Sequence, residues 1–322
     1  MILLWRIAMK CNFACGFCAY DRRLDIPRHE ADPSEVARVV GLFREVAAQK
    51  PERLHVSWLG GEPFLWPPLL ELSQQISDYG DVAISATTNG SRLSVPGVRQ
   101  QILSSFSELT ISIDGPPHIH DQLRGVPGAF AKTEQAVGQL VAERTALGAP
   151  LKIRVNTVLM RRTVPHLAEL CRMLADWDVD EITFNQLGGR DRPEFFPENS
   201  LRPEDVATLR AVVPDLVSEL ADRGVVLCAN DLYLDRIAAS SRGETLQVVD
   251  CKPGETFYFI DEAGIIAPCG FTSEEYGIPS SSLRTREDVK VLPSRFRELQ
   301  TTKRSVACDD CLSTQVFGKF AG

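Results

Sequence analysis

The sequence predicts an α/β protein built around a parallel β-sheet. Short β-rich runs alternate with helical patterns over roughly the first 230 residues, and glycine or polar residues follow each run. Repeated strand-then-helix units with right-handed crossovers give parallel sheets. Six strands are expected, at residues 3–8, 54–58, 82–87, 109–113, 151–158 and 181–185.

The clearest helical pattern follows the first expected strand. Asp32 can cap a helix, and Pro33 suits its first turn. The apolar residues that follow recur at helical spacing and predict one buried face, made of Val36, Val39, Val40, Phe43 and Val46. Residues 164–176 and 204–223 have the same character.

The unusual polar segments all follow expected strands. A three-cysteine loop follows the first strand, GGEP the second, TNG the third and SIDG the fourth, while Asn156 and Asn185 lie near the ends of the fifth and sixth. Parallel sheets bind their ligands at the carboxyl ends of the strands. These segments therefore predict one active site at a single rim.

The pattern changes after about residue 230. Residues 255–269 predict a β-hairpin with an Asp-Glu-Ala-Gly turn, and residues 277–293 predict a loop rich in serine, arginine and proline. Two domains are expected, at residues 1–230 and 231–322.

Composition excludes several classes of protein. The 322 residues carry a net charge of −8 without a basic stripe, which argues against nucleic-acid binding. No apolar run is long enough to span a membrane. Nine cysteines, an odd number, without an export signal favour reduced thiols used for metal binding or catalysis, and a cytoplasmic protein is expected.

Three of those cysteines are closely spaced in KCNFACGFCAY, where Cys11, Cys15 and Cys18 form C-x3-C-x2-C. Three thiolates on a four-iron cluster leave one iron without a protein ligand, open to a cofactor or substrate. The alternative is an incomplete zinc site, since a structural zinc ion takes four ligands.

With Phe17 before its third cysteine, this spacing resembles the signature of the radical SAM superfamily, and the run SIDGPPHIHDQLRG resembles its sulfatase-maturase-like branch. The resemblance implies a partial (β/α)6 barrel with a [4Fe–4S] cluster. The cluster binds S-adenosylmethionine and cleaves it reductively to a 5′-deoxyadenosyl radical that removes a substrate hydrogen atom. The cofactor-binding residues it implies are Phe17, Tyr20, Gly60, Gly61, Glu62, Pro63, Asn89, Ser112, Asp114, Arg124 and Asn156. Glu62 is expected to meet the amino group of the cofactor, and Ser112 and Arg124 its carboxylate.

A second cysteine group lies near the end of the chain. Cys251, Gly264 and Cys269 are spaced C-x12-G-x4-C, and Cys308 and Cys311 form C-x2-C. This resembles the twitch domain, a shortened SPASM extension, and implies one auxiliary [4Fe–4S] cluster with four cysteine ligands. A structural zinc site is the alternative.

The first hypothesis for function is oxidation or epimerisation of a small hydroxylated or amino-bearing metabolite in a biosynthetic pathway. The second is maturation of a ribosomally made peptide by cross-linking, oxidation or epimerisation, and the third is a non-enzymatic metal-binding or electron-carrier protein. An electron donor such as flavodoxin or ferredoxin is an expected partner.

Catalytic candidates are few. Arg190, Asp191 and Asp231 are candidates for a base, and Cys228 for a hydrogen-atom donor. Some twitch-type epimerases carry a thiol directly after the second auxiliary ligand, where this chain has Gly270, which argues against that version of epimerisation.

Overall fold

The computed structural model describes residues 1–49 and 51–319. Over these residues one open sheet of ten strands forms, in the order β10-β9-β8-β1-β2-β3-β4-β5-β6-β7. Strands β1 to β7 are parallel, β8 runs parallel to β1, and β9 and β10 are antiparallel to their neighbours. The strands are β1 (Ile2–Ala8), β2 (Leu54–Gly60), β3 (Val82–Thr88), β4 (Glu108–Ser112), β5 (Lys152–Leu159), β6 (Glu181–Gln186), β7 (Val226–Cys228), β8 (Phe257–Ile260), β9 (Ile265–Ala267) and β10 (Ile278–Pro279).

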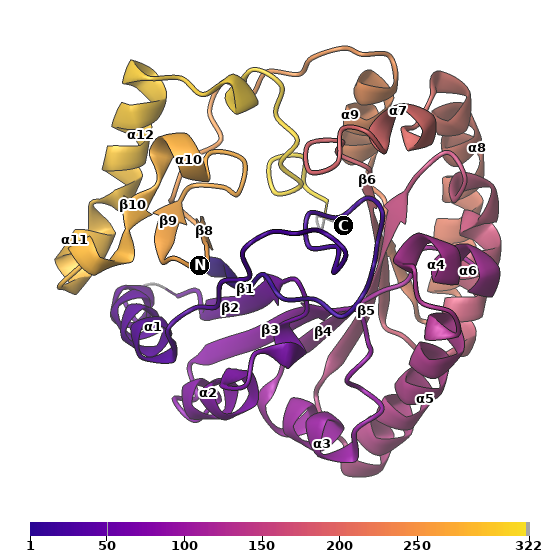
Figure 1. Cartoon of the computed structure of the whole chain (residues 1–322), viewed down its shortest axis with the longest axis horizontal. Coiled ribbons are helices and arrows are strands. Elements are labelled where there is room, and N and C mark those ends of the chain that lie inside the picture. The colour runs from indigo at the N-terminus through magenta and orange to yellow at the C-terminus, as the bar shows by residue number, and fades with distance from the viewer. Residues whose placement is uncertain (50, 320–322) are drawn as a thin grey trace.

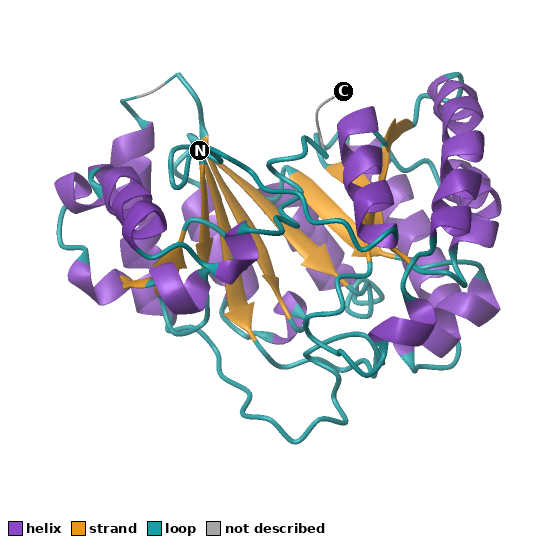
Figure 2. Cartoon of the chain, turned by 90° about the horizontal axis from the view of Figure 1, so that it is seen from above, coloured by secondary structure: helices purple, strands orange, loops and turns teal. Residues whose placement is uncertain are grey.

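Helices cover the outer face of the curved sheet (Figure 1). In Figure 2 the strand arrows of the parallel part run the same way, and long loops lie beyond their tips. The helices are α1 (Pro33–Ala47), α2 (Leu69–Ser77), α3 (Pro96–Ser105), α4 (Pro117–Arg124), α5 (Ala129–Leu147), α6 (Leu167–Asp176), α7 (Phe196–Asn199), α8 (Pro203–Ala221), α9 (Asp231–Ser241), α10 (Ser273–Tyr276), α11 (Arg286–Lys290) and α12 (Leu292–Thr302).

Alternation along the strands separates the core from an open interior. In β5, Ile153 and Val155 are buried beneath the helices, whereas the alternate residues Arg154 and Asn156 point the other way and are only half-buried. Arg154 pairs there with Glu108 of β4 and with Glu181 of β6. A concave face lined by polar groups can hold a polar ligand, while the apolar core lies between the sheet and its helices.

The structure confirms most of the expected elements. All six predicted strands form within two residues of the expected bounds, Asp32 caps α1 through the amides of Ser34 and Glu35, and β8 and β9 form the predicted hairpin. The loop expected at 277–293 is wrong, because this stretch contains β10, α11 and the start of α12. No described helix is both long and apolar enough to cross a lipid bilayer.

The β8–β9 hairpin extends the main sheet. Strand β8 pairs with β1 from Ile2↔Phe257 to Trp5↔Ile260, so the sheet continues from the expected first domain into the second. The expected second domain ends with residues 320–322, which lie outside the described residues. This continuity fixes the C-terminal cysteines relative to the rim of the sheet.

Candidate active site

The three-cysteine loop lies directly after β1, at the carboxyl end of the parallel strands. Cys11, Cys15 and Cys18 pack in one small cluster with Phe13 and Phe17. The amide of Phe13 donates to Sγ of Cys11, and the amide of Tyr20 donates to Sγ of Cys18, each at 3.4 Å. Both hydrogen bonds favour thiolates at these positions.

Burial alone works against thiolates in this loop. It raises the pKa of Cys15 to about 11 and that of Cys18 to about 12. A bound metal centre would supply the positive charge that thiolates need here. Among the described residues, no three His, Cys, Asp or Glu side chains converge on one point that a single ion could occupy. Three thiolates fit a [4Fe–4S] cluster, which takes each on a different iron, better than they fit a structural zinc ion, which takes four ligands.

GGEP, at the end of β2, packs against the start of the cysteine loop. Gly60 and Gly61 lie under that loop so closely that a Cβ would come within 2.1 Å of the Ala8 carbonyl oxygen and 2.3 Å of the Lys10 carbonyl oxygen. Only glycine permits this approach. Pro63, which is buried, then begins a short 3-10 helix at Pro63–Leu65.

Glu62 is fully buried and already bound by the protein. Its carboxylate accepts hydrogen bonds from the amide of Asn89 at 2.7 Å, the hydroxyl of Thr88 at 2.8 Å and the amide of Phe64 at 3.2 Å. Burial nevertheless raises the pKa of Glu62 to about 7. Glu62 thus ties GGEP to TNG, a structural role that the sequence did not indicate, and its contact with a cofactor stays a prediction.

Asn89 and Arg124 both reach the cysteine loop. The side-chain nitrogen Nδ2 of Asn89 donates to Oδ1 of Asn12 at 2.9 Å and lies 3.8 Å from Sγ of Cys11. The guanidinium of Arg124 lies 5.5 Å from the centre of the Phe17 ring, and its Nη1 is 4.0 Å from Sγ of Cys15. Two segments expected at one rim therefore do meet there.

Asp114 holds Arg124 in place. The two side chains form an ion pair at 2.7 Å, with Asp114 fully buried and Arg124 8% exposed. The second carboxylate oxygen of Asp114 accepts the amide of Val158 at 2.9 Å. Sequence reasoning treated Asp114 as a ligand contact, whereas the structure shows it in an internal ion pair.

Ser112 and Asn156 lie side by side on β4 and β5. Oδ1 of Asn156 accepts a hydrogen bond from Nζ of Lys319 at 3.0 Å, and Oδ1 of Asn185 accepts one at 2.6 Å. Lys319 is 3% exposed, and burial lowers its pKa to about 7. No motif surrounds Lys319 in the sequence, so only the path of the chain end reveals it.

A chamber of about 950 Å³ lies beside the cysteine loop. Its walls include Phe17, Cys18 and Tyr20 on one side and Cys269 and Gly270 on the other. Arg190 and Asp191 also line it, from the loop after β6. Tyr20 accepts a hydrogen bond from Arg6 at 3.4 Å within the chamber.

Two catalytic candidates do not line this chamber. Asp231 begins α9 and is exposed. Cys228 is buried in β7, where its thiol donates to Oε1 of Glu181 at 2.7 Å and its pKa is raised to about 12 by burial. Neither side chain therefore lies where it could contact a ligand in the chamber.

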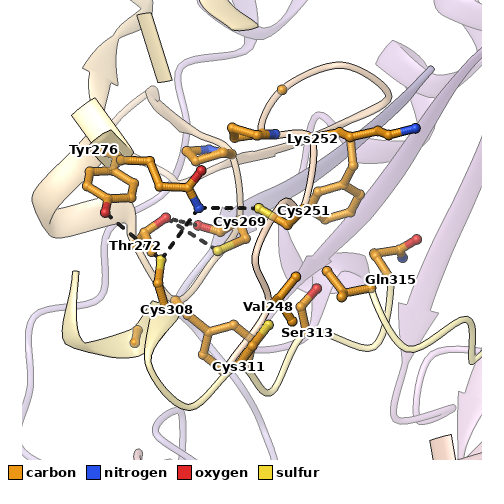
Figure 3. A pocket seen from close by; sticks show the side chains of 18 of the residues that line it. Val248, Cys251, Lys252, Cys269, Thr272, Tyr276, Cys308, Cys311, Ser313 and Gln315 are labelled. Atoms are coloured by element: carbon orange, nitrogen blue, oxygen red, sulfur yellow. Dashed lines mark hydrogen bonds between the residues drawn. The ribbon is translucent and has the colours of Figure 1, made fainter. Parts of the chain in front are cut away.

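The four C-terminal cysteines meet in a second, smaller cavity of about 180 Å³ (Figure 3). They come from the loop before β8, the end of the β8–β9 hairpin and the loop after α12, and are Cys251, Cys269, Cys308 and Cys311. A structural zinc ion also takes four thiolates, so zinc stays the alternative occupant of this cavity. Four thiols around one cavity fit the four irons of a [4Fe–4S] cluster.

A cysteine loop at the rim of an open parallel barrel, beside a large chamber, is the arrangement of a radical SAM enzyme. The chain belongs to the radical SAM superfamily, whose family model matches residues 5–174.

Its relatives in sequence include an AdoMet-dependent heme synthase of Oleidesulfovibrio alaskensis, 24% identical over 86% of this chain and 71% of that protein. The mycofactocin maturase MftC of Mycobacterium tuberculosis is 23% identical over 96% of this chain and 75% of its own length.

Solved structures share the fold. SuiB of Streptococcus suis bound to S-adenosylmethionine has a TM-score of 0.68 at 16% identity, covering 97% of this chain and 72% of that one. Native anSMEcpe with bound AdoMet has a TM-score of 0.67 at 18% identity, covering 99% and 88%.

Proposed function

We propose that this radical SAM enzyme performs a two-electron oxidation of a substrate held in the chamber between two iron–sulfur clusters. The observation that carries the proposal is the chamber wall, which contains Cys18 of the first cysteine group and Cys269 of the second. A substrate in this space would lie near both the site of radical formation and a one-electron acceptor.

Cys11, Cys15 and Cys18 would hold the first cluster. When bound, that cluster supplies the electron that splits S-adenosylmethionine into methionine and the 5′-deoxyadenosyl radical, which takes a hydrogen atom from the substrate. Arg124 offers a guanidinium to the methionine carboxylate, pre-oriented by its ion pair with Asp114. The other residues predicted to contact the cofactor, among them Phe17, Tyr20 and Asn156, stay candidates for binding it.

Cys251, Cys269, Cys308 and Cys311 would hold the auxiliary cluster. When bound, it supplies a one-electron acceptor with no open iron. The oxidised substrate has then lost one hydrogen atom to 5′-deoxyadenosine, one electron to this acceptor and one proton to a base. The electron for cofactor cleavage would come from flavodoxin or ferredoxin in a reducing compartment such as the cytoplasm.

Oxidation is favoured over epimerisation by the thiols available. Epimerisation requires a hydrogen-atom donor on the far side of the substrate. Among the described residues that line the chamber, the thiols are Cys18 and Cys269, and both are proposed cluster ligands. Gly270 also lines the chamber and has no side chain to offer.

Asp191 is the candidate base. It lines the chamber next to Arg190, and an arginine cannot accept a proton at physiological pH. Asp231 lies outside the chamber wall.

The first substrate candidate is a small hydroxylated or amino-bearing metabolite. A chamber of about 950 Å³ lies at the upper end of small-molecule sites and can hold the cofactor beside such a substrate. The second candidate is a ribosomal peptide. It is favoured by the likeness to the maturase MftC and to SuiB, one structure of which is bound to the precursor peptide SuiA.

Anaerobic reconstitution tests the proposal. Wild type should bind roughly eight irons, and a Cys11→Ala/Cys15→Ala/Cys18→Ala variant roughly four, with loss of S-adenosylmethionine cleavage under dithionite. Four irons and one zinc in wild type would refute the auxiliary cluster. Substrate classes are then separated by whether a metabolite or a peptide raises 5′-deoxyadenosine formation and emerges two hydrogens lighter.

A further inference from the structure

Gln300, on α12, places its side-chain amide between two of the C-terminal cysteines, Cys251 and Cys308. Its Nε2 lies 3.5 Å from Sγ of Cys251 and 4.0 Å from Sγ of Cys308. A thiolate can only accept, so the NH2 end of the amide must face the sulfurs. That end carries two hydrogens, and one side chain can serve both cysteines.

Tyr276 gives Cys308 a second donor. It is 1% exposed, and its oxygen accepts the amide hydrogen of Ser305 at 2.6 Å. The hydroxyl hydrogen of Tyr276 is then available to Sγ of Cys308, 3.9 Å away. Cys308 therefore has two neutral donors directed at it from α10 and α12.

Thr272 is a weaker donor, and it reaches only the sulfur of Cys269. Its Oγ1 lies 3.3 Å from Sγ of Cys269 but also 3.4 Å from the carbonyl oxygen of the same residue. A hydroxyl has one hydrogen, so these two acceptors compete for it. Gln300 has no such competitor, because the described structure gives its Nε2 only the two sulfurs as partners.

Hydrogen bonds to cluster sulfurs favour the more negative, reduced state of the cluster and raise its reduction potential. Charged groups also lie near the cavity: Arg304 pairs with Asp309 at 2.8 Å on the exposed side, and the buried Arg236 pairs with Asp310, between Cys308 and Cys311, at 2.6 Å. Gln300 and Tyr276 are neutral donors directed at the sulfur atoms themselves.

We propose that Gln300, assisted by Tyr276, sets the reduction potential of the auxiliary cluster and keeps that cluster able to accept the electron of the substrate radical. This inference rests on the proposed function. Gln300 is a positioning residue for electron transfer and does not touch the substrate, because it lines the small cavity and not the chamber.

The test is a redox titration of the auxiliary cluster, followed by electron paramagnetic resonance. The full-length Cys11→Ala/Cys15→Ala/Cys18→Ala chain gives the auxiliary signal alone. Gln300→Met keeps the bulk of the side chain and removes both donors. We expect it to lower the reduction equilibrium constant about tenfold, which is about 59 mV for one electron. Tyr276→Phe should shift the potential the same way by less.

Thr301→Ala is the matched control. Thr301 is the next residue on α12, and its hydroxyl binds the carbonyl oxygen of Arg297, away from the sulfurs. It should leave the potential unchanged. Gln300→Glu, which adds a negative charge, should lower the potential at least as far as Gln300→Met.

The possible failures are distinguishable. If the triple-alanine chain carries no iron–sulfur signal, the auxiliary cluster of the proposed function is wrong. If the signal is present but Gln300→Met and Gln300→Glu both titrate within twofold of the parent, the cluster stands and the role of Gln300 is overturned.

Discussion

The ion pair of Arg124 with Asp114 makes the sharpest prediction about the core of the site. Arg124→Met removes the cation and leaves the Asp114 carboxylate fully buried, with the amide of Val158 as its remaining hydrogen-bond donor. Removing one partner of a buried pair costs about 3–5 kcal/mol, because the other charge stays out of water. At about 2 °C per kcal/mol for a large domain, the melting temperature of the apo protein should fall by about 6–10 °C.

A double variant separates the charge from the packing. Asp114→Asn/Arg124→Met has no buried charge, and the asparagine oxygen can still accept the amide of Val158. We expect it to be less destabilised than Arg124→Met, with a loss of about 1–2 kcal/mol. The double variant should also bind S-adenosylmethionine at least about tenfold more weakly than wild type, because the proposed bidentate partner of the cofactor's carboxylate is gone.

The control is an exposed pair of similar geometry. Arg172 binds both carboxylate oxygens of Glu219 at 2.8 Å, but the two side chains are 53% and 38% exposed. Arg172→Met should leave stability close to that of wild type, because an exposed ion pair contributes little. Thermal unfolding of the apo proteins measures all three variants. Equal losses for Arg124→Met and Arg172→Met, or a double variant no more stable than Arg124→Met, would refute the reasoning.

Three further predictions concern packing, pH and the buried thiol. Gly61→Ala sets a Cβ against the Lys10 carbonyl oxygen, and it should cost about 1–3 kcal/mol of stability and reduce iron binding. Gly97→Ala is the control, because a Cβ there meets no atom within 4 Å, and it should change neither property. Melting curves and iron counts test both variants. Burial lowers the pKa of His120 to about 3. As pH falls below about 6.5, the unfolded chain therefore takes up a proton on this imidazole before the folded chain does. The free energy of unfolding should drop by about 1.4 kcal/mol per pH unit between about pH 6.5 and pH 3. His120→Asn should flatten this slope in unfolding measurements from pH 7 to 5, and the exposed His29→Asn should leave it unchanged. Cys228→Ala deprives Glu181 of a donor and should cost about 1–3 kcal/mol, yet 5′-deoxyadenosine formation should stay at the wild-type rate; a loss of that activity in folded protein would contradict the placement of Cys228 outside the chamber.

Local signals explain why much of the fold could be predicted. Runs such as residues 54–58 and 82–87 are short and have an apolar residue at every second position, and a cap such as Asp32 acts on its own helix within three residues. The start and end of each element therefore depend on neighbours in the sequence. The stretch 277–293 failed because its helices are short and two of its buried side chains, Val289 and Leu292, are set by packing and not by a long periodic pattern.

The candidate site, too, could be predicted where it depends on local spacing and not where it depends on tertiary contacts. The spacing of Cys11, Cys15 and Cys18 was sufficient for the cluster hypothesis, because all three ligands lie within one loop. The polar residues of GGEP and SIDG were correctly expected at one rim, since parallel strands end at the same edge. What each side chain does at that rim could not be read in the same way. Glu62 binds the backbone amide of Asn89, and Asp114 pairs with Arg124. In both cases the partner belongs to another element of the fold, so no local pattern in the sequence indicates the contact.

By itself, then, the sequence determined the order of strands and helices, the cysteine loop and the superfamily. These depend on short-range spacing, which survives in a one-dimensional pattern. The tertiary structure alone decided that Cys269 faces the chamber of Cys18 and that Lys319 enters between Asn156 and Asn185. Such contacts join residues 163 positions apart, for Asn156 and Lys319, and 251 positions apart (269 − 18), for Cys18 and Cys269, and only the packing of the folded sheet brings them together.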